Sequence, residues 1–389
     1  MSKFSDKTYA DVMDHLESLE PYVLITTGRT GTDFFQSLLD SHTEVLTFNG
    51  GFFFHDFWNN AKCTKTNNIT ISDLLDEFIG MHLEKLKSKY DLREKKGSLG
   101  ENSDQSIDID LTLFKSEATK LLHDRQINSR NFMLAVYGAY AICLNQNLLN
   151  MKLLLHHLHN AERLPPYIED FPDSKIICMT RDPRANFVSG VINWRNYDKY
   201  YDCGWLLYYY IRRIIIDAYF IDEYANDYIV IRLEDLGNKS ILLALCDWLN
   251  IKYENTLERS TWGGLRWRGD RLSNQENAEI GWSSKMIENS WQTKLSFLDK
   301  YLFNFLLNDR LINYKYQHSR IHFYDYLIVP FIILIPLSFE MRFFSLNYIS
   351  SLLKTKKHTM IFKNFAYYIK RALHFYQVFF KPIGGSRFS

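Results

Sequence analysis

The chain has 389 residues, of which 46% are hydrophobic and 16% aromatic, enough apolar surface for one large domain with an appendage or for two smaller domains. This composition excludes a disordered chain and a disulfide-stapled mini-protein. The formal net charge is only +1, which excludes a global field that would draw the chain to nucleic acid.

The charge is unevenly distributed along the chain. Residues 341–389 contain nine of the 46 Lys and Arg residues and no Asp or Glu, so positions 1–340 carry 37 basic and 45 acidic residues. This split predicts a basic appendage on an acidic body. The five cysteines are far apart and form no CxxC pair, and residues 1–20 are polar. We therefore expect a reducing, cytosolic environment without a secretory signal or N-terminal anchor.

The first predicted elements are a strand, a tight turn and a helix. YVLITT at 22–27 is a short β-rich apolar run, TTGRTGT at 26–32 is a glycine-containing turn, and DFFQSLLDSH at 33–42 places its apolar residues on one helical face. Backbone N–H groups in such a turn and the positive end of the helix dipole stabilise anions. The turn therefore predicts a phosphate or sulfate site.

The turn is not a Walker A loop. That loop requires Gly-Lys-Ser/Thr after its spacer, whereas here Arg29 precedes Gly31 and Asp33 follows Thr32. A magnesium-nucleotide phosphotransferase is therefore disfavoured.

The middle of the chain predicts further helices and strands. Residues 60–130 read as helices interrupted at 93–110 by a polar stretch that we expect to be a mobile surface loop, and 131–146 reads as a buried helix. Three apolar runs read as strands buried on both faces, MKLLLHH at 151–157, KIICMTR at 175–181 and DYIVIRLED at 227–235. This alternation predicts an α/β fold, a parallel sheet with helices on both sides.

The C-terminal region differs from the body. Residues 326–339 form an uncharged run with two prolines that is shorter than the roughly 20 residues of a spanning helix. Downstream, 339–358 and 362–380 interleave aromatic residues with cations at helical spacing. We expect an interfacial or re-entrant membrane segment. The alternatives are a buried core helix beside a solvated basic helix and, least favoured, a nucleic-acid surface, since no recognised reading motif accompanies the cations.

A second anion signal lies in KIICMTRDPRANFVSG at 175–190. Arg181 falls at the end of a predicted strand, and Ser189 lies eight residues later on the helix that RDP opens. A strand-end guanidinium and a helical hydroxyl can converge on one phosphate.

With these segments, the chain resembles the sulfotransferases that use 3′-phosphoadenosine 5′-phosphosulfate (PAPS). FPDSK at 171–175, RLEDL at 232–236, WGGLRWRGD at 262–270 and the helix containing Trp291 and Leu295 are also similar to segments of that superfamily. The resemblance covers about residues 20–315 and is nearest to the bacterial and Golgi-type carbohydrate branch. It implies a P-loop-NTPase-like central parallel sheet flanked by helices.

The resemblance also implies a division of the chain. A sulfotransferase domain would occupy residues 1–318, with a helical acceptor-binding insertion at about 50–130. Residues 319–389 would form a basic, aromatic-rich helical appendage at a membrane surface.

The resemblance implies roles for individual residues. Arg29 would offset charge that grows on the bridging oxygen as the sulfuryl group leaves. The other predicted donor-binding residues are Gly28, Thr30, Gly31, Thr32 and Asp33 for the 5′-phosphate, Arg181 and Ser189 for the 3′-phosphate, and Arg266, Arg268 and Gly269 from a closing loop. Asp33 departs from the hydroxyl residue found in many relatives, and a carboxylate there would repel the donor unless it points away, caps the helix or orients Arg29.

A general base must deprotonate the acceptor hydroxyl, and imidazole suits neutral pH. His156 is the predicted base, because it stands where the resemblance places a strand-end histidine; His157 and a carboxylate elsewhere are the alternatives. His157 and Lys152 are predicted substrate contacts, although Lys152 also fits a solvated strand-edge lysine. With His159, these histidines resemble a metal cluster, but carboxylate and cysteine partners at ligand spacing are missing, so we predict no metal.

The resemblance thus predicts an enzyme that transfers a sulfuryl group from PAPS to a carbohydrate hydroxyl, including that of a lipid-linked glycan or glycolipid. We expect it to lie peripherally or monotopically on the cytosolic face of a membrane, without nucleic acid as a partner. The alternatives are a P-loop-like kinase, which would need magnesium, and a non-catalytic membrane-tethered module that binds the nucleotide.

Overall fold

The structure, a computed structural model, describes residues 8–26, 28–61, 70–90, 97–217, 228–269, 281–287 and 291–380. These form two compact units. The sheet unit comprises residues 1–26, 31–179 and 226–286, and the helical unit comprises residues 27–30, 180–225 and 287–389.

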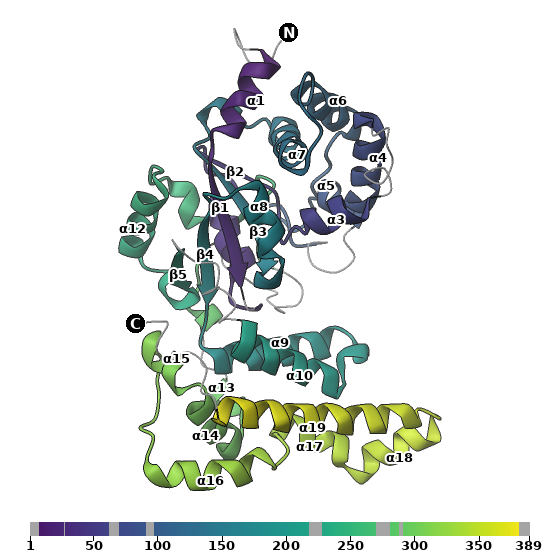
Figure 1. The fold of residues 1–389 in the computed structure, drawn as a ribbon, viewed down its shortest axis with the longest axis vertical. Coiled ribbons are helices and arrows are strands. Elements are labelled where there is room, and N and C mark those ends of the chain that lie inside the picture. Colours follow the sequence, from purple (N-terminus) through teal and green to yellow (C-terminus); the bar gives the residue numbers. More distant parts are fainter. Residues whose placement is uncertain are drawn as a thin grey trace. The chain divides into compact units, whose positions relative to one another are not determined.

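The sheet unit is built on a five-stranded sheet in the order β2-β3-β1-β4-β5 (Figure 1). The strands are β1 (Glu20–Thr26), β2 (Val45–Thr47), β3 (Leu153–Asn160), β4 (Lys175–Thr180) and β5 (Tyr228–Arg232). β1 pairs in parallel with β3 and β4, and β2 pairs in parallel with β3. The predicted α/β fold with a central parallel sheet is confirmed, and the three-residue strand β2 was not predicted.

Side chains alternate across this sheet, so neighbouring residues of β3 identify the helices on each face. His156 contacts Tyr137 of α7 (Ser129–Cys143) and stacks on Tyr167 of α8 (Leu164–Asp170). His157 contacts Gln36 of α2 (Thr32–Leu39) on the other face. Helices therefore cover both faces of the sheet.

The remaining helices of the sheet unit include those within residues 50–130, where an acceptor-binding insertion is predicted. They are α1 (Tyr9–Glu17), α3 (Phe54–Asn60), α4 (Ile71–Met81), α5 (Leu83–Leu86), α6 (Leu111–Leu121) and α12 (Lys239–Leu249). The expectation of a mobile loop at 93–110 is wrong for its described part. Leu99, Ile107 and Ile109 are buried, and Leu99 forms a backbone bridge to Trp267, so apolar side chains spaced far apart anchor this polar stretch. Residues 93–96 lie outside the described residues.

The helical unit contains α9 (Pro183–Tyr197), α10 (Gly204–Arg212), α13 (Trp291–Lys294), α14 (Phe297–Leu306), α15 (Asn308–Asn313), α16 (Phe323–Ile333), α17 (Ser338–Met341), α18 (Leu346–Lys354) and α19 (His358–Phe380). One hydrophobic core joins Phe187 of α9 and Phe303 of α14 with Ile333 of α16 and Phe375 of α19. Figure 1 shows α19 (yellow) running alongside α10. The predicted boundary between residues 318 and 319 therefore does not separate two cores, because the C-terminal helices share theirs with residues 180–316.

Candidate functional site

The predicted anion-binding turn lies directly between β1 and α2. Gly28, Arg29 and Gly31 have φ angles of 81°, 55° and 85°, and Gly31 caps the first turn of α2. A tight turn at a helix N-terminus is a common place for an anion to bind. The backbone conformation is therefore compatible with the predicted phosphate or phosphosulfate site.

Two glycines of the turn leave space that a Cβ would fill. At Gly31, a Cβ would lie 2.5 Å from Cδ1 of Leu233, and at Gly28 it would lie 3.5 Å from the guanidinium of Arg213. The absent Cβ of Gly31 therefore makes room for the Leu233 side chain, and Gly28 lies beside a guanidinium. The predicted binding of a donor phosphate at this turn stays a prediction.

Arg213 was missed by the sequence analysis. It is buried and begins a π-helical turn, Arg213–Asp217, a local distortion that is frequent at functional sites. Burial raises the pKa of the Tyr210 phenol, and the charges of Arg29 and Arg213 oppose that shift. These two cations of the helical unit therefore act on the same buried ring. The only sequence signal for Arg213 is a cation inside the apolar run IRRIII.

The RDPR segment divides into structural and candidate binding residues. Asp182 caps α9, and its carboxylate accepts hydrogen bonds at 2.9 and 2.7 Å from the guanidinium of Arg184, which lies 4.0 Å from the Trp291 ring centre. These residues hold the start of α9. Arg181 precedes the helix, Ser189 lies in its second turn, and both are partly exposed. Their predicted convergence on one phosphate stays a prediction.

His156 does not lie where a general base must be. It pairs with Val23 in the middle of the sheet, is fully buried, and has its Nδ1 2.8 Å from the Tyr137 hydroxyl. Burial, together with the charges of His55 and His157, lowers its pKa well below the usual 6.5. The structure therefore does not support the prediction of His156 as the catalytic base, because the ring is buried in the core under α7 and α8.

His157, on the opposite face of β3, has a defined tautomer. Gln36 donates from Nε2 to the Phe48 carbonyl at 2.8 Å, and its Oε1 accepts from Gly50 N–H at 3.0 Å, so backbone groups fix the orientation of the amide. Because the same Oε1 lies 2.9 Å from His157 Nδ1, that nitrogen must carry a proton and donate it. Asp33 Oδ1 lies 3.6 Å from the same nitrogen. The carboxylate at position 33 thus faces an imidazole.

His159 is the histidine nearest the end of β3. The register between β1 and β3 shifts after Leu24, so that Ile25 pairs with His159, whose φ is 68°. Such a bulge re-aims a side chain, and backbone strain of this kind concentrates at functional sites. His159 Nδ1 lies 3.4 Å from His157 Nε2. In a neutral His157 that is protonated on Nδ1, Nε2 would accept from His159 Nδ1–H, and the lone pair of a neutral His159 ring would then lie on Nε2.

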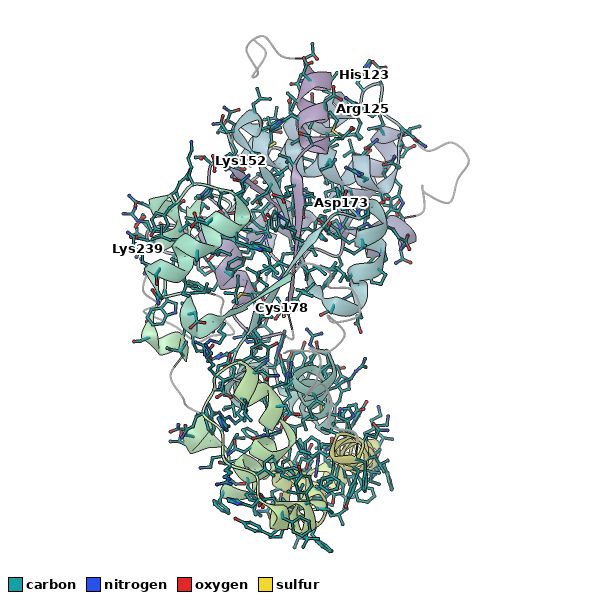
Figure 2. The ribbon with its side chains drawn as sticks, turned by 60° about the vertical axis from the view of Figure 1, so that its left-hand side comes forward. His123, Arg125, Lys152, Asp173, Cys178 and Lys239 are labelled. Carbon is teal, nitrogen blue, oxygen red and sulfur yellow. The ribbon has the colours of Figure 1, made fainter. Side chains whose placement is uncertain are left out.

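Lys152 lies at the wrong end of the sheet for a substrate contact. It precedes β3, its carbonyl accepts from the N–H of Glu20 at the start of β1, and its ammonium pairs with Glu44 at 2.9 Å. The other end of β1, which leads into the turn that contains Gly31, is six residues and roughly 20 Å farther along the strand. Figure 2 labels Lys152 away from Cys178, which lies near the carboxyl end of β4. The predicted substrate role is corrected to that of a strand-edge ion pair.

The closing-loop arginines have other partners in the structure. Arg266 ends the second strand of the hairpin β6 (Thr261–Trp262) and β7 (Leu265–Arg266), and Arg268 follows that hairpin. The turn of the hairpin donates two backbone N–H groups to Asp40 at the end of α2. Arg266 pairs with the Glu101 carboxylate at 2.6 Å, and Arg268 donates to the Glu101 carbonyl. The turn of the hairpin is thus tied to the opposite end of α2 from Gly31. These contacts do not support a nucleotide role for Arg266 and Arg268, and that of Gly269 stays a prediction.

Comparisons with known proteins identify the family of the chain. A model of the sulfotransferase family matches residues 21–255, more than half of the chain. Among solved structures, the sulfotransferase domain from the Synechococcus PCC 7002 olefin synthase is 13% identical, with 71% of this chain and 88% of that chain covered at a TM-score of 0.34. The sulfotransferase domain from the curacin biosynthetic pathway is also 13% identical, with 77% and 99% covered at a TM-score of 0.33. No curated protein matches the chain. The family match spans the anion-binding turn, the Arg181–Ser189 pair and the histidines of β3, and this chain belongs to the sulfotransferase family, a family of transferase enzymes whose sulfate donor is generally PAPS.

Proposed function

We propose that this enzyme transfers the sulfuryl group of PAPS to a hydroxyl of a carbohydrate, including that of a lipid-linked glycan or glycolipid. The observation that carries the proposal is the left-handed turn at Gly28, Arg29 and Gly31 on the N-terminus of α2. PAPS supplies an activated sulfuryl group that passes to the acceptor oxygen and leaves adenosine 3′,5′-bisphosphate.

On the donor side, the chain supplies backbone N–H groups and cations. The N–H groups of Thr30, Gly31 and Thr32 would hold the 5′-phosphate, and Arg181 with Ser189 would hold the 3′-phosphate. Arg29 would stabilise the charge that develops on the bridging oxygen, in the way fixed cations stabilise transition states. Arg213, beside Gly28, adds a second guanidinium to this turn.

On the acceptor side, we assign the general base to His159 in place of His156. Its Nε2 would take the proton of the acceptor hydroxyl as the new oxygen–sulfur bond forms. The resulting imidazolium would keep its Nδ1–H on His157 Nε2, while Gln36 and Asp33 hold His157 in the matching tautomer. Orientation of a base by a second group is how catalytic imidazoles are positioned generally.

Two variants test donor and base separately. Transfer of labelled sulfate from PAPS should fall about 100-fold or more in Arg29→Ala, because a preorganised charge is lost. It should also fall about 100-fold or more in His159→Ala, because general base catalysis is lost. Binding of adenosine 3′,5′-bisphosphate, measured by calorimetry, should persist in His159→Ala.

Matched controls remove the same kinds of side chain elsewhere. Lys239→Ala removes an exposed cation on α12, and His123→Ala removes an exposed histidine, both labelled in Figure 2 away from the carboxyl end of β4. Both should transfer sulfate like the unmodified chain. Unchanged turnover in Arg29→Ala would defeat the donor assignment, and unchanged turnover in His159→Ala would defeat only the base.

A further inference from the structure

The longest helix of the chain carries an exposed apolar stripe on the face opposite its buried one. On α19, Phe362, Phe365, Ile369, Leu373 and Phe380 are all exposed, with Phe362 74% and Phe380 73% accessible. Their spacing of three, four, four and seven residues places them on one side of the helix. Soluble surfaces rarely leave such a continuous apolar row uncovered.

α16 carries a second stripe of the same kind. Tyr324, Leu327, Ile328 and Phe331 are exposed, and the row continues into Leu334 after the helix ends. Residues three, four and seven apart on a helix share one face. Two helices of one unit therefore each present a strip of large apolar side chains.

The end of α16 is built so that its backbone does not need water. The Arg371 guanidinium donates to the carbonyls of Ile333 and Ile335 at 2.6 and 3.2 Å, and the Tyr368 hydroxyl donates to the Leu334 carbonyl at 2.6 Å. The Tyr376 hydroxyl donates to the Pro330 carbonyl at 2.7 Å. Carbonyls at a helix end normally bond to water, and non-helical backbone at membrane depth requires protein partners instead. Side chains of α19 thus supply partners to four carbonyls in and after the last turn of α16.

The exposed charge around these helices has one sign. Residues 321–380 contain only two carboxylates, Asp325 and Glu340, and both are buried. Glu340 is paired with Arg371 at 2.8 Å. The exposed ionised groups of these residues are the cations Lys354, Lys356, Lys357, Lys363, Lys370 and Arg342, of which Arg342 pairs with the Asp202 carboxylate. Cations beside an apolar stripe match an anionic lipid surface.

The lengths of the elements favour a helix pair that lies along the membrane. Within the described part of the chain, Phe323–Phe344 is the one segment long and apolar enough to cross a membrane by length and composition. The structure breaks it after the 11 residues of α16, which rise about 16 Å, roughly half of the hydrocarbon core. α19 is longer, but Lys363, Lys370 and Arg371 lie in its middle.

We propose that α16 and α19 dock the helical unit on an anionic bilayer, with their exposed apolar stripes in the interface and without spanning it. A second copy of the chain is a poorer occupant, because pairing these faces would bring lysines together with no exposed carboxylate between them. The inference does not depend on the sulfuryl-transfer reaction, since it rests on residues 321–380 alone.

The test uses the full-length chain and point substitutions. Deleting the C-terminal helices would uncover Phe187 and Phe303 of the shared core, so loss of solubility would obscure the result. Sedimentation with vesicles of phosphatidylglycerol and phosphatidylcholine is measured for Phe365→Glu/Leu373→Glu and for the unmodified chain. Each of the two substitutions should lower the bound-to-free ratio at least about tenfold, because each removes an apolar side chain that the proposal buries in the bilayer. Ile241→Glu/Leu243→Glu, on exposed positions of α12, is the matched control and should bind vesicles like the unmodified chain.

Further measurements distinguish a lipid surface from a second copy of the chain as the partner of these helices. Lys363→Gln/Lys370→Gln should weaken binding to anionic vesicles and leave the weak binding to pure phosphatidylcholine unchanged. Binding equal in the Phe365→Glu/Leu373→Glu variant and the unmodified chain would overturn the proposal. The proposal would also be overturned if the unmodified chain formed a stable dimer that vesicles do not dissociate, while the Phe365→Glu/Leu373→Glu variant was a monomer. Binding of adenosine 3′,5′-bisphosphate, followed in parallel, reports separately on the donor site.

Discussion

The two units differ in where they place their large apolar side chains. Within the described residues, the sheet unit exposes three of them, Met81, Ile241 and Leu243, whereas the helical unit exposes 21, of which 16 lie from Phe323 onwards. The sheet unit buries apolar faces against its own helices. The helical unit has a core of its own and an uncovered apolar surface in addition, which is the distribution that the proposed docking on a bilayer requires.

The polar groups inside the two units also differ. The sheet unit holds a hydrogen-bonded row from Gln36 through His157 to His159. The helical unit holds a buried ion pair, Arg371 with Glu340, that closes a helix end. Substitutions that disrupt one of these two networks should therefore leave the other intact.

The largest expected effect comes from breaking the buried ion pair. Arg371→Met leaves the Glu340 carboxylate and the carbonyl of Ile333 without the guanidinium, and should cost about 3–5 kcal/mol of unfolding free energy. Replacement of both partners, Arg371→Met/Glu340→Leu, should recover part of that loss because no charge is then left buried. Denaturant unfolding of the full chain measures both values, and a double variant less stable than Arg371→Met would contradict this account of the pair.

A smaller effect is expected at the anion-binding turn. Gly31→Ala places a Cβ 2.5 Å from Leu233 at a φ of 85°, and should cost about 1–3 kcal/mol. It should also weaken binding of adenosine 3′,5′-bisphosphate by at least tenfold, because the turn is distorted. The control, Gly80→Ala, adds a methyl group to α4 where nothing lies within 4 Å, and should stabilise the chain by about 0.5–1 kcal/mol. Unweakened nucleotide binding by Gly31→Ala would count against the turn as the donor site.

The smallest effect separates His156 from catalysis. Burial lowers the folded-state pKa of His156, so the unfolded chain takes up an extra proton as the pH falls below about 6.5, and stability is lost there. His156→Gln keeps a group that can bond to Tyr137 and removes this proton uptake. The drop in melting temperature between pH 7 and pH 5 should therefore be smaller in His156→Gln, while the pH profile of sulfate transfer stays the same. A shifted activity profile would return His156 to the candidates for the base.

The elements that could be predicted from the sequence are those with a strong local pattern. Apolar runs predicted β1, β3, β4 and β5, and the glycine turn was predicted from its position between a strand and a helix. The proposed base, His159, could not be predicted in the same way. The alternation of side chains along a regular strand suggests His156 or His157 as the base. Only the register shift beside Ile25, seen in the structure, shows that His159 lies near the end of the strand.

Other parts of the site depend on contacts between distant segments. Arg213 lies 185 residues after Gly28, and no local pattern connects the two. The C-terminal helices were expected as an appendage because their composition differs from that of the body. That composition does not reveal that Ile333 and Phe375 complete the core begun by Phe187.

The central claim, that one donor is held by the turn at Gly28–Thr32 and by Arg181 with Ser189, is tested most directly by a structure of the full chain bound to adenosine 3′,5′-bisphosphate. Our account predicts the 5′-phosphate on the N–H groups that open α2 and the 3′-phosphate on the Arg181 guanidinium and the Ser189 hydroxyl. A nucleotide with either phosphate bound elsewhere would contradict it.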